Sequence, residues 1–284
     1  MHKYTLKGHI YTNVEGCQKL IDFYNYASSF KDCWFHLDLL NLEWIDANLC
    51  SELFLYCHLL KSKNRIKFFI DYSALKGHLN VLSRNGFAYY VVHDKSKFQQ
   101  YDERESVIPL KAFNIDEVDK FANYIEKSFL KQRGLENVEI QSKEKVKSSY
   151  FEIFDNVGIH SNTETPIFCC GQYFPEQSEL KFTLTDYGDG FLKKIKDYTL
   201  NEITTADKAI DWAVKGGSTK PKQDNIKGGN GLKKMMMLCY NTGGVLAIVT
   251  DGCFWKIENK KIDIQQLKNH RKGATIHLIF RNLE

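Results

Sequence analysis

The stretch TLTDYGDG at residues 183–190 decides how the second half of this 284-residue chain is interpreted. It is typical of a strand that ends in the pattern D-x-G-x-G, formed by Asp186, Gly188 and Gly190. A carboxylate at a strand end accepts a hydrogen bond from an exocyclic amino group, and two glycines allow the backbone to fold tightly under a flat ring. Taken alone, the pattern is equally typical of a polar turn, because Asp and Gly are common turn residues.

A second glycine-rich pattern, GGNGL at residues 228–232, runs directly into an expected helix over 232–242. Glycines that open a helix leave backbone N–H groups free at its positive end, where phosphate groups bind. The alternative interpretation of this pattern by itself is a flexible loop.

The third pattern, FEIFDNVGIH at residues 151–160, predicts an amphipathic helix. At about 100° per residue, Glu152, Asn156 and His160 fall on one side of this helix, with Asp155 beside them. Apolar side chains occupy the opposite side, which we expect to face a sheet. Such a polar side is most often simply solvated.

Taken in order, the three patterns resemble the nucleotide site of the GHKL ATPase superfamily, which includes DNA gyrase and the histidine kinases. The resemblance covers roughly residues 148–284 and implies a Bergerat fold, in which helices cover one face of a mixed, mostly antiparallel sheet. It implies that Glu152 is the catalytic general base that orients the attacking water. It also implies that Asn156 is the ligand of Mg²⁺ and that Asp186 binds the adenine amino group, above a pocket floor shaped by Gly188 and Gly190.

The same resemblance assigns the remaining cofactor-binding residues. Gly229 and Gly231, followed by Leu232, would present backbone amides to the phosphates. Gly273–Thr275 is similar to the last glycine box of the family, which places Thr275 near the adenine. His160 falls where many members carry a polar residue near the phosphates, although a structural imidazole is as common there.

Residues 191–228 then correspond to the mobile ATP lid of the family. A short helix is expected over 205–215, followed by a flexible basic segment. Lys220, Lys222 and Lys227 are each candidates to reach a γ-phosphate, and loop lysines are ordinarily solvated. Lys227 is preferred because it directly precedes the glycine cradle.

The distribution of glycine and charge agrees with a local site in the second half. Five of the 18 glycines lie in residues 1–150 and 13 in residues 151–284, and glycine accumulates where a backbone approaches a ligand closely. The 39 Lys and Arg residues balance 35 Asp and Glu residues, with a net charge of +2 on each side of the boundary after Lys147. No basic surface is expected, and therefore no nucleic-acid partner.

The sequence predicts a cytoplasmic protein without membrane association. No apolar run approaches the ~20 residues of a membrane-spanning helix, and the first residues lack the pattern of a secretory signal. The eight cysteines show no C-x-x-C pair, which favours reduced, mostly buried thiols over a zinc site.

Residues 1–109 are expected to form a separate small α/β domain. Strands are predicted over 34–39, 65–70 and 88–92, and helices over 47–61 and 75–84. Residues 31–93 resemble a STAS domain, as in the antagonists of anti-sigma factors. Those antagonists are phosphorylated on a serine just after the aspartate that matches Asp46, but Ala47 and Asn48 follow here, and Ser51 lies a turn further on. A docking or packing module is therefore expected.

A helical connector over 110–147, containing a helix at 116–132, links this domain to the ATP-binding domain at 148–284. In the latter, strands are expected over 167–174, 180–186, 244–250, 253–258 and 274–281, with a two-residue hairpin turn at Asp251-Gly252. The fold class is therefore α/β followed by α+β.

Three functions are compatible with these patterns. The first is a Mg-ATP-binding regulatory protein that hydrolyses ATP slowly and controls a protein partner through its lid. The spacing of Glu152 and Asn156 favours hydrolysis or phosphoryl transfer over binding alone. The second is a serine protein kinase that acts on a STAS-like partner, and the third is a non-catalytic, nucleotide-gated interaction module. Binding of ATP and ADP is common to all three, and the sequence leaves open whether the chain forms a homodimer.

Overall fold

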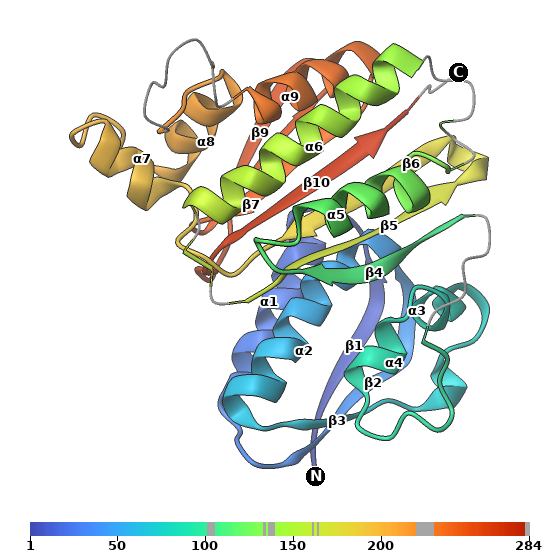
Figure 1. The fold of residues 1–284 in the computed structure, drawn as a ribbon. Coiled ribbons are helices and arrows are strands. Elements are labelled where there is room, and N and C mark those ends of the chain that lie inside the picture. The colour runs from blue at the N-terminus through green and yellow to red at the C-terminus, as the bar shows by residue number, and fades with distance from the viewer. Residues whose placement is uncertain are drawn as a thin grey trace.

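Two β-sheets and a series of helices make up this computed structural model, which describes residues 1–100, 106–132, 135, 140–160, 162–163, 165–219 and 230–281 (Figure 1). The smaller sheet is parallel, with the order β1–β2–β3, formed by His2–Ile10, Trp34–Ile45 and Lys67–Phe69. The helices of this N-terminal unit are α1 (Val14–Ser28), the 3-10 turn η1 (Ala47–Leu49), α2 (Cys50–Asn64), α3 (Val81–Arg84) and α4 (Phe87–Val91).

The larger sheet has seven strands in the order β4–β5–β6–β10–β7–β8–β9, and every neighbouring pair is antiparallel. Its strands are β4 (Val107–Phe113), β5 (Ile167–Phe174), β6 (Glu179–Thr185), β7 (Val245–Thr250), β8 (Cys253–Glu258), β9 (Lys261–Gln266) and β10 (Ala274–Phe280). The helices of this second unit are α5 (Val118–Tyr124), α6 (Ile140–His160), α7 (Leu192–Tyr198), α8 (Ala206–Val214) and α9 (Gly231–Thr242).

Helices cover both faces of the larger sheet (Figure 1). On one face, α5, α6 and α9 pack on an apolar core that includes Phe182, Ile248 and Trp255. On the other face, α1 and α2 of the N-terminal unit pack on Phe168 and neighbouring apolar side chains, so that the two units share a single core. From the sequence we expected helices on one face of this sheet only, because residues 1–109 were expected to form a separate domain.

Strand β6 shows how the two faces differ. Leu180, Phe182 and Leu184 point to the α6 side, since alternate residues of a strand point to opposite faces. Lys181, Thr183 and Thr185 therefore point toward the N-terminal unit. This alternation places a row of polar side chains inside the interface between the two units.

The polar row is paired with the loop between β2 and α2. Lys181 Nζ lies 3.0 Å from Asp46 Oδ2, and Asn48 Nδ2 donates a hydrogen bond of 2.8 Å to Thr183 Oγ1. Asp46 also accepts hydrogen bonds from Thr12 and from the indole of Trp44. The loop that resembles the phosphorylation loop of STAS domains is thus buried against the larger sheet.

The expected strand at 88–92 is wrong, because residues 87–91 form helix α4. Gly86 adopts a left-handed φ of +88° in front of this helix, and Asn85 Oδ1 accepts a hydrogen bond from the Phe87 backbone N–H. The buried residues Phe87, Ala88 and Val91 then have helical rather than alternating spacing.

The described part of residues 110–147, expected to be a helical connector, belongs largely to the second unit. Strand β4 begins at Val107 and pairs with β5, and Phe121 of α5 stacks on Phe154 of α6 with ring centroids 4.3 Å apart. Strands β1 and β9 and helix α1 were not predicted. The hairpin turn at 251–252 is confirmed, with φ values of +50° and +77° between β7 and β8.

The structure also bears on two expectations from composition, which concern the cysteines and membrane-spanning helices. Seven of the eight cysteines are buried, Cys33 is partly exposed, and all eight are free thiols. Among the described helices, none combines the length and apolar character that crossing a bilayer requires.

The ion pair between Asp46 and Lys181 yields a prediction about stability. Asp46→Ala should lower the free energy of unfolding by about 3 kcal/mol, because it leaves the largely buried Lys181 ammonium group with only Glu179 at 3.6 Å and leaves three partly buried donors, on Thr12 and Trp44, without their acceptor. Denaturant titration of the purified protein measures this loss. Asp32→Ala is the matched control: Asp32 pairs with Arg65 on the surface, where an ion pair contributes little. Equal losses in the two variants would contradict a stabilising role of the interface.

Candidate functional site

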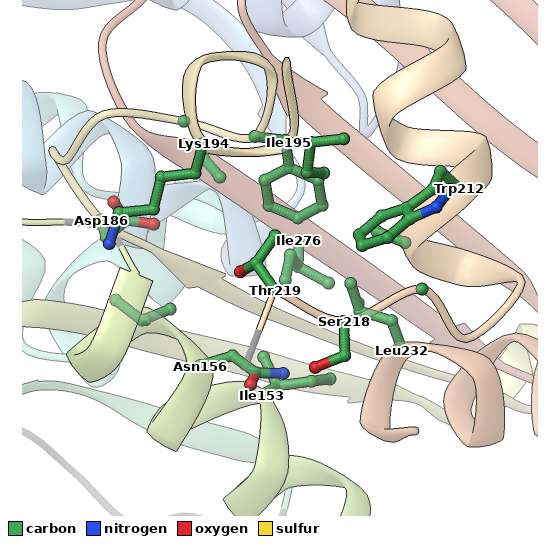
Figure 2. Close-up of a pocket in the computed structure, with 16 residues that line it drawn as sticks. Ile153, Asn156, Asp186, Lys194, Ile195, Trp212, Ser218, Thr219, Leu232 and Ile276 are labelled. Carbon is green, nitrogen blue, oxygen red and sulfur yellow. The ribbon is translucent and has the colours of Figure 1, made fainter. Parts of the chain in front are cut away.

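A pocket of about 100 Å³ lies between α6, the loop after β6, the α7–α8 segment and the start of α9 (Figure 2). Apolar side chains make up most of its wall, among them Ile153, Phe191, Ile195, Trp212, Leu232 and Ile276. The polar side chains are Asn156, Asp186, Lys194, Ser218 and Thr219. This balance of apolar and polar groups is typical of small-molecule sites, whereas the enclosed volume lies below their usual range.

The pocket brings together residues from all three sequence patterns. Asn156 comes from α6, Asp186 and Gly190 from the D-x-G-x-G loop, and Leu232 from the first turn of α9. These segments are 30 to 46 residues apart along the chain. Their convergence around one cavity is a structural result that no single pattern implies.

Asp186 is buried at the end of β6 and held by its own loop. Its Oδ1 accepts a hydrogen bond of 2.8 Å from the Gly188 backbone N–H, and its backbone N–H donates to the carbonyl of Ala274. Burial raises the pKa of Asp186 to about 6, although the positive charge of Arg271 and the Gly188 N–H act in the opposite direction. The carboxyl group therefore ionises close to neutral pH.

Two glycines allow the loop around Asp186 to lie close to its neighbours. Gly190 has φ of +74°, and a Cβ there would lie 2.7 Å from Thr250 Oγ1 and 2.8 Å from Asp251 Oδ1. Gly273 has φ of +80°, and a Cβ there would lie 2.2 Å from the carbonyl oxygen of Asp186. Both positions require glycine because of their backbone conformation and of the space available.

Glu152 lies one helical turn before Asn156, at the contact between α6 and α9. Its Oε1 accepts a hydrogen bond from the Asn230 backbone N–H, and its Oε2 lies 3.7 Å from Lys234 Nζ. A Cβ on Gly231 would lie 2.8 Å from the Cβ of Glu152, so glycine permits this close approach. The carboxylate thus occupies the positive N-terminal end of α9, where a phosphate group would also be stabilised.

The structure does not bring Thr275 to the pocket. Its side chain points to the opposite face of β10, where its hydroxyl forms a hydrogen bond of 2.7 Å with Thr185 Oγ1. Its neighbours Ala274 and Ile276 line the pocket instead. Lys227 and Gly229, with Lys220 and Lys222, lie outside the described residues, as does the side chain of His160.

The α7–α8 segment, expected to be a lid, forms one wall of the pocket. The predicted helix at 205–215 is confirmed as α8, with Thr205 in the capping position. The ring of Trp212 lies over Gly217, where a Cβ would approach Cδ2 to 2.2 Å. Sequence reasoning missed the pocket residues Trp212, Phe191 and Lys194, for which aromatic and basic residues inside the expected lid were the available signal.

Sequence reasoning also missed Arg271, which supports the pocket from behind. Its Nη2 donates hydrogen bonds of 2.9 Å to the carbonyl of Asp186 and 2.6 Å to Thr185 Oγ1. Its Nε lies 3.7 Å from Oε1 of Glu52 in α2. One buried guanidinium group therefore contacts both the loop that holds Asp186 and the N-terminal unit.

Comparison with known proteins adds no family assignment. No protein-family model matches this chain, and no curated protein matches its sequence.

A pair of glycine substitutions tests the packing of the loop around Asp186. Gly77→Ala, at φ of +55° with open space around it, should cost about 1 kcal/mol from backbone strain alone. Gly190→Ala should cost about 1–3 kcal/mol more, because its Cβ also meets Thr250 and Asp251. Denaturant unfolding of both variants measures the difference. Equal losses would mean that the loop adapts without the contacts described.

Proposed function

We propose that this protein binds ATP in the pocket between α6 and α9 and uses the bound nucleotide to control a protein partner. The observation that carries the proposal is the convergence of Asn156, Asp186, Gly190 and Leu232 on one cavity. The resemblance of the three patterns to the GHKL superfamily supplies the identity of the nucleotide.

The end of the pocket near Asp186 suits an adenine ring. A buried carboxylate accepts a hydrogen bond from an exocyclic amino group, and a charge-assisted bond of this kind is stronger than a neutral one. Gly190 lines the pocket beside Asp186, and Ile153, Ile195 and Ile276 would supply apolar contacts to a flat ring. The adenine end of the ligand is thereby distinguished from a guanine, which carries a carbonyl oxygen at the corresponding position.

The other end suits phosphate groups and a magnesium ion. The side-chain oxygens of Asn156, Ser218 and Thr219 line the pocket there, and hard cations prefer oxygen ligands. When bound with the nucleotide, magnesium would supply charge neutralisation for the phosphates. Asn156 would hold the ion, whereas the Lys194 side chain extends on the Asp186 side of the pocket (Figure 2).

Glu152 is the residue that would accept the proton of an attacking water. Its carboxylate binds the N–H of Asn230 and faces Lys234. A residue so engaged fits slow turnover, since these contacts must loosen before the carboxylate is available as a base. The proposed activity is therefore slow hydrolysis, with nucleotide binding as the primary function.

The N-terminal unit, for which we propose a STAS-like fold, serves in this scheme as an internal packing module. Asp46 and Asn48 are engaged by strand β6 of the same chain, and the Ser51 hydroxyl is buried and donates to the carbonyl of Asn48. Ser51 is thus unsuited to accept a phosphate group. A serine kinase activity would have to act on a separate partner.

Nucleotide-dependent stabilisation tests the proposal directly. Mg-ATP should raise the melting temperature of the wild-type protein by several degrees, and GTP should do so less. Asp186→Asn should weaken ATP binding by roughly 10- to 100-fold, because it removes a charge-assisted hydrogen bond. Asp189→Asn is the control from the same loop, since its side chain binds Asn162 and Lys193 instead. Absence of any shift with adenine nucleotides in the wild-type protein would refute the proposed function.

The pKa of Asp186 adds a pH dependence to the same measurement. As the pH falls through about 6, the free protein protonates Asp186 and loses the charged acceptor, so ATP affinity should fall by about tenfold between pH 7.5 and pH 5. The Asp186→Asn variant should show no such step. Because the pKa in the folded state exceeds that of an exposed Asp, the same carboxyl group destabilises the fold as the pH rises through this range.

The role of Glu152 is separable from binding. Glu152→Gln should leave Mg-ATP binding nearly unchanged and reduce phosphate release by at least about 100-fold, because it removes the proposed base. Glu144→Gln, on the same helix, is the control. Phosphate release that is unchanged in Glu152→Gln would eliminate the hydrolytic step, and ATP binding without any phosphate release in the wild type would indicate a nucleotide-gated module.

A further inference from the structure

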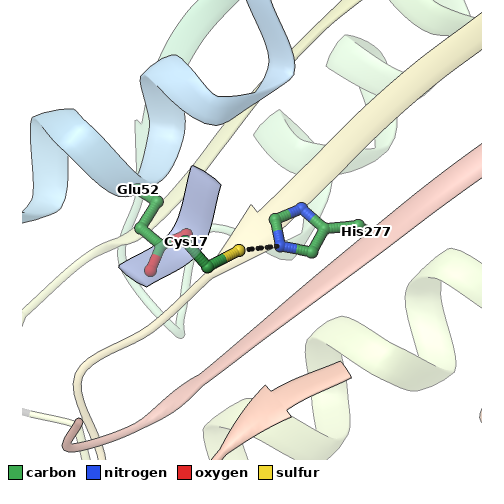
Figure 3. A group of neighbouring side chains, drawn as sticks. All are labelled: Cys17, Glu52 and His277. Atoms are coloured by element: carbon green, nitrogen blue, oxygen red, sulfur yellow. Dashed lines mark hydrogen bonds between the residues drawn. The ribbon is translucent and has the colours of Figure 1, made fainter. Parts of the chain in front are cut away.

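Three buried side chains of metal-binding type meet behind the larger sheet, outside the nucleotide pocket (Figure 3). They are Cys17 from α1, Glu52 from α2 and His277 from β10, and each of them is fully buried. Their ligand atoms lie within 4.8 Å of one another. The two units of the protein therefore contribute jointly to this cluster, two residues from the first and one from the second.

The imidazole of His277 is oriented by a chain of hydrogen bonds. Its Nδ1 forms a hydrogen bond of 2.8 Å with Thr183 Oγ1, which in turn accepts 2.8 Å from Asn48 Nδ2. This leaves Nε2 directed at Cys17 Sγ, at 3.7 Å. Two ligands of a tetrahedral zinc ion, a sulfur and a nitrogen, are separated by about 3.5 Å, and a metal-binding histidine ordinarily has such a partner on its other nitrogen.

One oxygen of the Glu52 carboxylate forms no hydrogen bond with the described residues. Its Oε1 accepts a hydrogen bond of 2.8 Å from the Tyr56 hydroxyl, whereas Oε2 is buried and has no hydrogen-bond partner among the described residues. A buried carboxylate oxygen without a partner is costly and calls for an explanation, of which a bound ion is one. A cation at this position would satisfy Oε2.

The charges around the cluster set the conditions for binding. Cys17 and His277 are fully buried, and the side chain of Arg271 is the buried positive charge close to the cluster. A divalent ion would displace the Cys17 proton to solvent, and the resulting thiolate and the Glu52 carboxylate would neutralise its charge. The positive charge of Arg271, at 3.7 Å from Glu52, opposes the ion and limits its affinity.

We propose that Cys17, Glu52 and His277 form a zinc site that joins the N-terminal unit to the larger sheet. The three side chains match the sulfur, nitrogen and oxygen ligands that zinc accepts in proteins. The proposal differs from the expectation based on cysteine spacing, because the ligands are 35 and 225 residues apart and leave no local motif.

A second cavity, of about 360 Å³, lies beside α1 and α2. Ile21 and Tyr56 line it, and they lie one helical turn after Cys17 and Glu52 respectively. Tyr24 and Arg271 line it as well, whereas the three proposed ligands are not part of its wall.

The test uses the full chain. The protein is incubated with zinc chloride, dialysed against metal-free buffer, and analysed for bound zinc by mass spectrometry, in wild type, Cys17→Ala and Cys57→Ala. Cys57 is the matched control, because it is a buried thiol on the same helix as Glu52. We expect about one zinc ion per chain in wild type and Cys57→Ala, its loss in Cys17→Ala, and a lower melting temperature of the wild type after treatment with a chelator.

Two further readouts keep the test decisive if Cys17→Ala does not fold. Cobalt added to the metal-free wild type should produce a thiolate-to-cobalt absorption band, and zinc affinity should rise with pH because binding releases the Cys17 proton. Wild-type protein that retains no zinc, gives no such band and shows no chelator effect would overturn the proposal. Equal zinc in Cys17→Ala would also overturn it and would direct attention to His36, Asp38 and Asp71, the second cluster of this kind among the described residues.

Discussion

The buried guanidinium group of Arg271 is the charge on which the arrangement of this molecule depends. It binds the carbonyl of Asp186 and the hydroxyl of Thr185 in the second unit and faces the carboxylate of Glu52 in the first. A charge buried to this degree is tolerated only where partners surround it, and those partners come from both units. The same group therefore contacts α2 and the loop around Asp186.

Local sequence patterns predicted many of the individual strands and helices but not how the two units pack together. The strands around Asp186 and the turn at 251–252 follow from alternation and turn chemistry, and helix α8 follows from apolar spacing. The stretch at 88–92 looks like a strand because its residues are β-branched and aromatic, yet the left-handed Gly86 starts a helix there. The burial of both faces of the larger sheet could not be predicted. Lys181, Thr183 and Thr185 give β6 a polar face, and a polar strand face is ordinarily solvated unless another unit is known to pack on it.

In the candidate site, too, some residues were predicted from local sequence patterns and others were found only in the structure. Asn156, Asp186, Gly190 and Leu232 were recognised in sequence, since each belongs to a local pattern, and the structure brings them to one pocket. Thr275 was placed there by resemblance, but the register of β10 turns its side chain to the opposite face. Arg271 and Trp212 carry no local signal, because their roles arise from contacts between segments that are distant in the chain.

The core that the two units share has a thermodynamic consequence. Since the larger sheet contributes Phe168, Val249 and Phe254 to the core beneath α1 and α2, the interior of the N-terminal unit is completed by the second unit, and the chain should unfold in one cooperative transition. A ligand that stabilises the loop around Asp186 then stabilises the backbone of α2 by linkage. Slower exchange of the α2 amide hydrogens would be the signature of an occupied pocket on the far side of the sheet.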